Sequence, residues 1–371
     1  MALDPTSLLV DLIGIDSVNP GLISGAAGEP AIVQHLAQRL SGQGFAVHVV
    51  HAGSDERRPS LVAIPPGGPG ARTVVLNGHL DTVGVSGMAA PFTARIDGDR
   101  LMGRGAADMK GGVAAMVAAA ETLAAQGAPV RPVLALVADE EDASLGSEAV
   151  IAALPRLGIS PEVCIIGEPT DLALARSLRG FAVMAVRFPG RAAHSSQPHE
   201  GVNALTHLGR FLAAVDARAA AVATAGGDLM VTQVRGGSSA FVIPDHAECT
   251  VERRTAPGEG QVSPVQEIEA LLQDDWSASI DLVAARPPWR LDSSGPAATL
   301  ARALGDRLGT GATFDAPYWM EAPLWQQVAP TLICGPSGGG LHSVDEWVSL
   351  DQVRRFATAI VDVLSGDPDA D

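Results

Sequence analysis

Short apolar runs and helix-like segments alternate along the N-terminal part of the chain. Continuous apolar runs at 133–138 and 163–166 are typical of strands buried on both faces of a parallel sheet. The alanine-rich segment 113–125 predicts a helix. At least four strand–helix alternations precede about residue 176, and this order predicts an α/β layer fold.

Polar side chains follow these predicted strands at the point where each strand ends. His79 and Asp81 follow an apolar run, and they share one face if the strand continues that far. Glu168 comes directly after the run 163–166, and His342 follows the later run 331–334. Ligands bind at the carboxyl ends of strands in open α/β sheets, so we expect these side chains to meet there.

Two further acidic segments have competing interpretations. Asp108 lies in a glycine-rich turn before the predicted helix, where it is either a ligand or a plain helix N-cap. The run 139–142 places four carboxylates after a buried strand, where they repel one another unless a positive group lies among them. A solvated acidic loop is the alternative for that run.

Taken together, the polar side chains form a mixed nitrogen and oxygen ligand set. Two imidazoles and three carboxylates exceed the need of one catalytic zinc and predict a pair of divalent ions sharing one carboxylate. Zinc is the expected metal, with cobalt or manganese as alternatives. Glu140 remains as the general base that deprotonates a water held between the ions. The predicted ligands are His79, Asp108, Glu141, Glu168 and His342.

The middle of the chain has a different pattern. Strands are predicted at 181–188, 229–234, 247–253 and 280–284, with helices at 203–220 and 262–272, which suits a small α+β sandwich. Helix and strand patterns return at 297–308, 331–334 and 351–364. Because His342 joins the earlier ligands, we expect one discontinuous domain, 1–177 and 288–371, interrupted by an insertion, 178–287.

The ordered motifs resemble the M20 family of metallopeptidases, which includes acetylornithine deacetylase, succinyl-diaminopimelate desuccinylase and glutamate carboxypeptidase. The resemblance runs over nearly the whole chain. Its motifs are SVNP (17–20), GHLDTV (78–83), GRGAADMKGG (103–112), ADEE (138–141), GEPT (167–170), AAHSSQPHEGVNA (192–204) and GGGLHSVDEWV (338–348).

The resemblance implies a zinc-peptidase-like catalytic domain with a mixed, mostly parallel sheet, and an inserted lid that forms a homodimer. It implies that Asp108 bridges the ions, that His79 and Glu168 serve different ions, and that Asp81 orients His79. In the lid, His194 would bind the scissile carbonyl oxygen in the partner subunit's site. Arg254 would bind a substrate carboxylate, whereas Arg253 is expected in solvent. Asn203 is expected to bind substrate, with a plain helix cap as the alternative.

Amide hydrolysis of an N-acyl amino acid is therefore the expected activity. Carboxypeptidase or dipeptidase cleavage of short peptides stays open, as do a single-metal or phosphate-directed hydrolase and a non-catalytic binding protein on the same scaffold. Two departures from the family leave the substrate open: Phe241 stands where asparagine is usual, and Glu321 stands where aspartate is frequent, near the site or at the surface.

The composition of the chain limits the binding partners and the cellular locations that are expected. A formal net charge of −17 argues against nonspecific nucleic-acid binding, and no run approaches the roughly 20 apolar residues of a membrane span. No apolar leader segment is evident. The three cysteines, 164, 249 and 334, lie in apolar strands and suggest no disulfide framework, which favours a reducing, cytoplasmic location.

Overall fold

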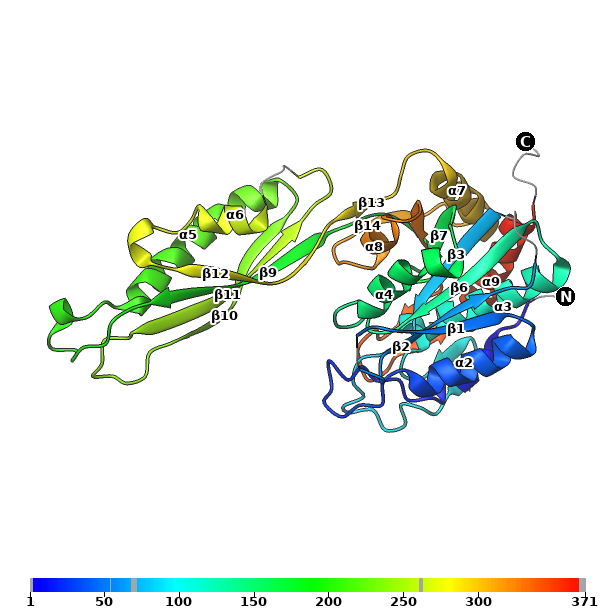
Figure 1. Cartoon of the computed structure of the whole chain (residues 1–371), viewed down its shortest axis with the longest axis horizontal. Helices are drawn as coiled ribbons and strands as arrows, with labels where there is room; N and C mark the ends of the chain where they lie inside the picture. The colour runs from blue at the N-terminus through cyan, green and yellow to red at the C-terminus, as the bar shows by residue number, and fades with distance from the viewer. Residues whose placement is uncertain (1–2, 54, 68–71, 260–262, 367–371) are drawn as a thin grey trace. The chain divides into compact units, whose positions relative to one another are not determined.

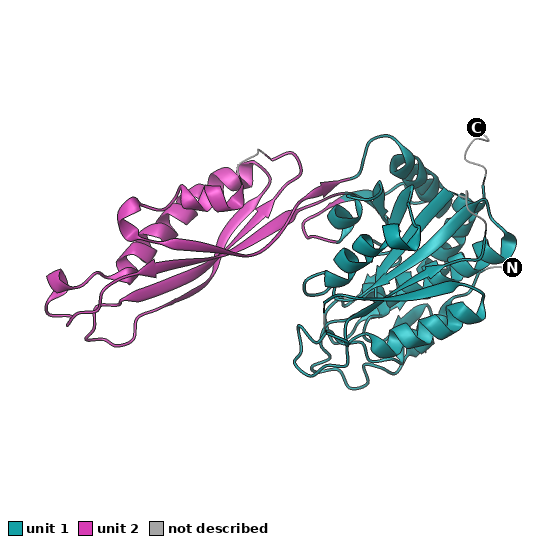
Figure 2. Ribbon diagram, viewed as in Figure 1, with its two compact units in different colours: residues 1–176, 291–314, 321–371 teal, residues 177–290, 315–320 magenta. Residues whose placement is uncertain are grey.

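The computed structural model describes residues 3–53, 55–67, 72–259 and 263–366. The chain divides into two compact units (Figure 2). Unit 1 comprises Met1–Arg176, Leu291–Phe314 and Glu321–Asp371, and unit 2 comprises Ser177–Arg290 and Asp315–Met320. The expected insertion 178–287 lies within unit 2, which also takes residues 315–320, a segment that the sequence pattern does not mark.

A six-stranded sheet in the order β1-β2-β6-β3-β7-β15 forms the centre of unit 1 (Figure 1). Strands β6, β3, β7 and β15 are parallel, whereas β2 runs antiparallel to both of its neighbours. The mixed, mainly parallel sheet expected for this fold class is thus confirmed. Its strands are β1 (Ala46–His51), β2 (Pro59–Ile64), β3 (Arg72–His79), β6 (Val130–Val137), β7 (Val163–Ile166) and β15 (Thr331–Ile333).

Helices cover both faces of this sheet. On one face, alternate strand residues such as Leu76, Leu134 and Ile165 pack with five helices in one large apolar core. These helices are α1 (Thr6–Ile13), α2 (Pro30–Gly42), α3 (Gly111–Gln126), α7 (Pro296–Leu308) and α9 (Leu350–Ser365). The other face contacts α4 (Leu145–Ala153) and α8 (Ala322–Trp325). Burial on both faces explains why the strand segments are continuous apolar runs.

A second, small sheet in unit 1 joins segments far apart in sequence. It contains β4 (Arg95–Asp97), β5 (Arg100–Met102), β16 (Gly338–Gly339) and β17 (Trp347–Ser349) in the order β16-β17-β5-β4. Trp347 pairs with Met102 and Val348 with Leu101. This pairing brings the glycine-rich turn after β5 beside the loop between β16 and β17, which carries His342.

Unit 2 is built around an antiparallel sheet in the order β10-β11-β9-β12. Alternate residues of β9 and β11, including Met184, Phe188 and Val251, face a core shared with α5 and α6. The elements are β9 (Gly180–Pro189), α5 (Ala204–Thr224), β10 (Asp228–Gly236), β11 (His246–Thr255), α6 (Pro264–Glu269) and β12 (Ser279–Arg286). The α+β arrangement predicted from the sequence is confirmed.

The remaining elements are short. Strands β8 (Leu174–Leu178), β13 (Trp289–Arg290) and β14 (Thr313–Ala316) carry the chain between the units. Single helical turns are η1 (Ala106–Lys110), η2 (Pro155–Leu157), η3 (Pro198–Glu200) and η4 (Asp274–Trp276). Within the described ranges, every helix is too short or too polar to cross a bilayer.

Candidate metal centre

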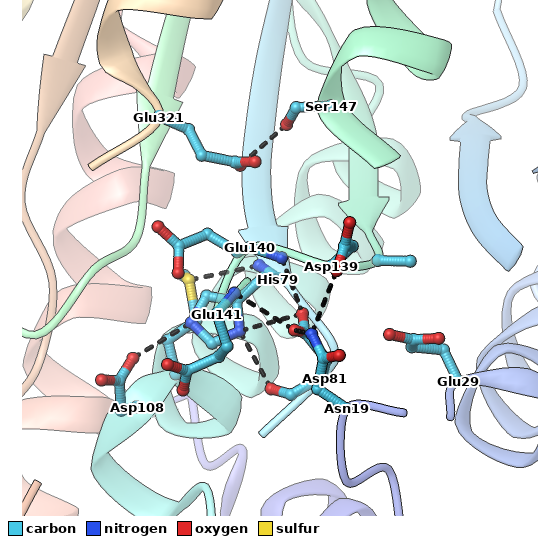
Figure 3. A network of polar contacts seen from close by, with 12 residues as sticks. Asn19, Glu29, His79, Asp81, Asp108, Asp139, Glu140, Glu141, Ser147 and Glu321 are labelled. Carbon is cyan, nitrogen blue, oxygen red and sulfur yellow. Dashed lines mark hydrogen bonds and ion pairs between the residues drawn. The ribbon is translucent and has the colours of Figure 1, made fainter. Parts of the chain in front are cut away.

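The predicted ligands of unit 1 converge where its parallel strands end. Figure 3 shows three of them, His79, Asp108 and Glu141. His79 is the last residue of β3, and Glu141 and Glu168 follow β6 and β7. Asp108 lies in the irregular turn η1 that opens α3, and its backbone is non-helical, with φ −118° and ψ 95°. His342 adopts a left-handed backbone, with φ 59°, in the loop between β16 and β17.

Asp108 lies between the two histidines. Its Oδ1 is 3.0 Å from Nε2 of His79, and its Oδ2 is 3.2 Å from Nε2 of His342. Each carboxylate oxygen thus faces a different imidazole, as a shared ligand requires. The alternative that Asp108 only caps the helix is wrong, because η1 and α3 begin with no side-chain cap.

The short contacts divide the other ligands into two groups. His342 Nε2 lies 3.1 Å from Oε2 of Glu141, and His79 Nε2 lies 3.9 Å from Oε2 of Glu168. This geometry places His79 and Glu168 on the same side of Asp108. It therefore favours one shared ion for these two residues, in contrast to the separate ions that the resemblance implied.

Two overlapping groups of these side chains could each hold a cation. Ligand atoms of His79, Asp108 and Glu141 lie within 4.8 Å of one another, and so do those of His79, Glu140 and Glu168. Oε1 of Glu141 is buried and has no hydrogen-bond partner in the described part of the chain. Carboxylate and imidazole without thiolate suit zinc, cobalt or manganese, and a cation would satisfy the unpartnered oxygen.

The charges of these carboxylates and imidazoles also favour bound cations. Burial raises the pKa of Glu140 and Glu168 well above the usual range, and their mutual repulsion raises the pKa of Glu140 further. Hydrogen bonds with Asp108 and Glu141 raise the pKa of His342 to about 10. Four carboxylates beside two imidazoles thus leave an excess of negative charge that positive ions would balance.

Asp81 contacts both His79, which it is expected to orient, and the loop after β6. Strand β3 ends at His79, so Asp81 lies beyond the strand. Nδ1 of His79 is 3.0 Å from the main-chain oxygen of Asp81 and 3.6 Å from its carboxylate. The carboxylate itself accepts the backbone N–H groups of Glu140 and Glu141, at 3.1 and 3.2 Å. Asp81 thereby holds the loop that carries the candidate base.

A buried polar group behind the site was missed from the sequence. Asn19 donates through Nδ2 to Asp81 at 2.7 Å and to Asp139 at 3.2 Å. The guanidinium of Arg58 pairs with Asp139 and lies 3.3 Å from Glu29. Arg58 is the positive group that the run 139–142 requires. Asn19 stands in the SVNP motif, which was the one available signal.

Glu321 is 1% exposed, so the surface alternative for this residue is wrong. Its Oε2 accepts a hydrogen bond from Ser147 Oγ at 2.7 Å (Figure 3). Ser147 Oγ in turn accepts one from Trp325 Nε1 at 3.0 Å. Burial raises the pKa of Glu321 to about 7. Glu321 therefore belongs to the buried polar group of unit 1.

The remaining candidate residues belong to unit 2. His194 is exposed, and its Nδ1 accepts a hydrogen bond from the backbone N–H of Ser196 at 3.2 Å. Nδ1 also lies 2.8 Å from Oγ of Ser196, so Ser196 occupies this ring nitrogen and leaves Nε2 for other partners. Asn203 caps α5, since its Oδ1 accepts from the N–H groups of Leu205 and Thr206 at 3.0 and 3.3 Å.

Neighbouring arginines of β11 have opposite environments. Arg254 lies over the ring of Phe181 and donates to Glu252 at 2.5 Å. Arg253 is 5% exposed and pairs with Glu259 and Glu267, so its expected solvation is wrong. Its side chain points to the helix-covered face of the sheet, where it donates a hydrogen bond to Glu267 of α6. Phe241 is 71% exposed, in the loop between β10 and β11.

Comparison with known sequences agrees with this geometry. Residues 75–365 match the model of Peptidase family M20/M25/M40. The chain is 31% identical to succinyl-diaminopimelate desuccinylase of Novosphingobium aromaticivorans, with 95% of each chain covered. It is 28% identical to acetylornithine deacetylase of Vibrio vulnificus, again over 95% of each chain.

Solved structures share the fold. Aminopeptidase PepT of Bacillus cereus superposes with a TM-score of 0.77 at 16% identity, covering 98% of this chain and 97% of that one. The YXEP protein of Bacillus subtilis, described as a dinuclear metal-binding peptidase of the M20 family, gives 0.71 at 15% identity, with 97% of both chains covered. At these identities the likeness concerns the fold alone.

Proposed function

The chain belongs to Peptidase family M20/M25/M40 and is a metal-dependent amidohydrolase, and we propose that it hydrolyses the amide bond of an N-acyl amino acid. The observation that carries this proposal is the position of Asp108, with one carboxylate oxygen toward each histidine. Two similar sequences are a desuccinylase and a deacetylase, which favours deacylation over peptide cleavage.

We assign the metal ligands as His79, Asp108 and Glu168 on one side and Asp108, Glu141 and His342 on the other. Two divalent cations held there, zinc or else cobalt or manganese, would acidify a water and polarise the substrate carbonyl. The buried, unpartnered oxygen of Glu141 supports this assignment.

Glu140 is the proposed proton carrier. Its carboxylate takes a proton from the attacking water and delivers it to the leaving nitrogen. Burial raises the pKa of Glu140, and a raised pKa suits a group that must both accept and donate a proton. Asp81 supports this role, since it binds the backbone N–H of Glu140.

In unit 2, we propose that His194 donates from Nε2 to the carbonyl oxygen as negative charge develops. The contacts of Ser196 with Nδ1, which leave Nε2 for the substrate, support this proposal. Arg254 would bind the substrate carboxylate through its guanidinium, and Asn203 would contribute its amide nitrogen. We further propose a cytoplasmic homodimer formed through unit 2, whose edge strand β12 exposes Leu282 and Val283 at 52% and 65%.

The direct test is a hydrolysis screen. N-acetyl and N-succinyl amino acids, together with dipeptides, are incubated with the protein and added zinc or cobalt. Turnover of acyl amino acids and not of dipeptides is expected. Cleavage of dipeptides alone would favour the carboxypeptidase or dipeptidase alternative, and no turnover of either class would contradict the proposal.

Glu140→Gln separates a base from a ligand, because Glu140 lies as close to His79 and Glu168 as a ligand would. As a base, its loss should lower kcat by about 10²–10⁴-fold while metal analysis still finds two ions per chain. Loss of one ion in this variant would instead make Glu140 a ligand.

His194→Ala tests the contribution of unit 2. Metal content should stay at the wild-type level, because the proposed ligands all belong to unit 1. A lost donor to the developing oxyanion should lower kcat by about 10²-fold or more. An unchanged kcat would remove His194 from the mechanism.

A further inference from the structure

Glu346 is a buried carboxylate that the proposed reaction does not use. It is 1% exposed and stands four residues after His342. Its Oε1 accepts the backbone N–H groups of Ala107 and Asp108, at 3.0 and 3.1 Å. Its Oε2 accepts from the backbone N–H of Gly105 at 3.0 Å and from Nη1 of Arg104 at 2.7 Å. Both oxygens are thus fully engaged by one short turn.

Hydrogen bonds within this turn fix it only in part: Ala106 N–H bonds to the main-chain oxygen of Gly103 at 3.2 Å, and Lys110 N–H bonds to that of Gly105 at 2.8 Å. Gly105 has a left-handed backbone, with φ 77°, and Asp108 departs from helical angles. The N–H groups of residues 105, 107 and 108 point at one carboxylate instead of at the carbonyls of a helix or strand. Glu346 therefore binds the three N–H groups that the backbone bonds of the turn leave over, including that of Asp108.

Arg104, in the turn of Asp108, makes a second connection between this turn and the loop that carries His342. It is 2% exposed, and its Nη2 donates to the main-chain oxygen of Ser343, the neighbour of His342, at 3.1 Å. One residue of each segment thus holds the other segment: Glu346 holds the turn of Asp108, and Arg104 holds the loop of His342. The N–H of Gly103 adds a bond to the main-chain oxygen of Glu346 at 3.2 Å.

We propose that Glu346, together with Arg104, is a positioning residue of the metal centre. Its carboxylate fixes the turn so that Asp108 faces His79 and His342 at once, and the Arg104 contact keeps His342 in register with that turn. This inference rests on the proposed two-cation function. Hydrogen-bonded groups behind metal ligands commonly change metal affinity about 10- to 100-fold when they are replaced.

Cobalt(II) titration of the metal-free, full-length protein tests the proposal. Calorimetry gives the number of ions and their affinities, and visible absorption reports ligand geometry without any substrate. Glu346→Gln keeps the size of the side chain but turns an amide group toward two donors. The expected result is about 10- to 100-fold weaker cobalt binding and an altered visible spectrum.

Glu267→Gln is the matched control. Glu267 is 8% exposed, and it accepts hydrogen bonds from Arg253 and Arg218 at 2.7 and 2.8 Å, within unit 2. This variant also loses one buried charge, but its cobalt affinity and spectrum should equal those of the wild type. If Glu346→Gln matches the wild type in both readouts, or if Glu267→Gln weakens cobalt binding equally, the proposal fails.

Arg104→Lys decides the matter if Glu346→Gln does not fold. A lysine keeps the charge but has no fork to reach both Glu346 and Ser343, so weaker cobalt binding is again expected; unchanged binding would overturn the proposal. Wild-type protein that fails to bind two cobalt ions would refute the proposed function itself. Two ions bound by the wild type and by Glu346→Gln with equal affinity would refute only the role of Glu346.

Discussion

Glu29 is a buried acid whose charge the surrounding residues balance only in part. Its side chain lies 3.3 Å from Nε of Arg58, but Arg58 also pairs with Asp139. Burial, together with the negative charge of Asp81, raises the pKa of Glu29 to about 8, although Arg58 acts to lower it. The folded protein therefore holds a proton on Glu29 in a pH range where the unfolded chain has lost it.

The sign of the resulting pH dependence follows from linkage. The pKa of Glu29 is 4.5 in the reference state and about 8 when folded, so the folded state binds more protons between these values. The free energy of unfolding should fall as pH rises through this window, by at most about 1.4 kcal/mol per pH unit from this group. Below pH 4.5 the contribution disappears, and above 8 the destabilisation is complete.

Glu29→Gln should remove this contribution. We expect the stability of the variant, relative to the wild type, to increase between about pH 5 and 8 and then to level off. Urea unfolding of both proteins at several pH values, with chelator present, measures the difference. Parallel stability curves across that window would show that Glu29 has an ordinary pKa in the folded protein.

For single residues, the sequence predicts the site residues that follow strands, but it does not predict the residues that hold those site residues in place. His79, Glu141 and Glu168 were predictable because each comes after an apolar run, and the topology places the ends of those runs together. Glu346 and Arg58 give no such signal. Each acts through a partner far away in the chain, and only the fold brings that partner within reach.

At the scale of the elements, the close packing of the start of α3 requires a glycine at position 112. A Cβ atom on Gly112 would lie 2.1 Å from the main-chain oxygen of Gly167, the residue before Glu168. Because that contact is with backbone, a side-chain rotation cannot relieve it. The glycine lets α3 approach the loop after β7, so the turn of Asp108 and the loop of Glu168 share one close contact.

Gly112→Ala should therefore disturb the packing and the site together. We expect a loss of stability of about 1–3 kcal/mol from overpacking, partly offset by the helix propensity of alanine, and weaker cobalt binding. Gly42→Ala at the end of α2 is the matched control, because a Cβ there meets nothing within 4 Å. Similar urea midpoints and cobalt affinities for the two variants would contradict this account.

Regular elements were predictable where a long pattern exists. The apolar runs and the alternation of β9 and β11 give clear signals, and these strands lie where the sequence predicts them. The two-residue strand β16 and three-residue strand β17 have too few residues to show a period. Yet the pairing of β16 with β17, and of β17 with β5, brings His342 toward Asp108, so this part of the site needed the structure.

At the scale of the whole molecule, the apolar core beneath the sheet of unit 1 and the core of unit 2 have no residue in common in the described part of the chain. One core joins the sheet of unit 1 to α1, α2, α3, α7 and α9, and the other joins the sheet of unit 2 to α5 and α6. All five proposed metal ligands belong to unit 1. A bound cation should therefore stabilise the folded state of unit 1 directly and that of unit 2 only if the units unfold together.

Hydrogen exchange measured by mass spectrometry distinguishes these cases. At a cobalt concentration of about 100 times Kd, a site that exists only in the folded state adds about 2.7 kcal/mol to its stability. Amides of β3, β6 and β7 that exchange by unfolding of unit 1 should then slow by about 100-fold relative to chelator-treated protein. Amides of β9 and β11 should exchange at the same rate with and without cobalt, because their protection depends on a core that holds no ligand. Equal slowing in both sets would show that the two cores unfold as one cooperative unit, and slowing in neither would show that the cations are not bound by the folded site.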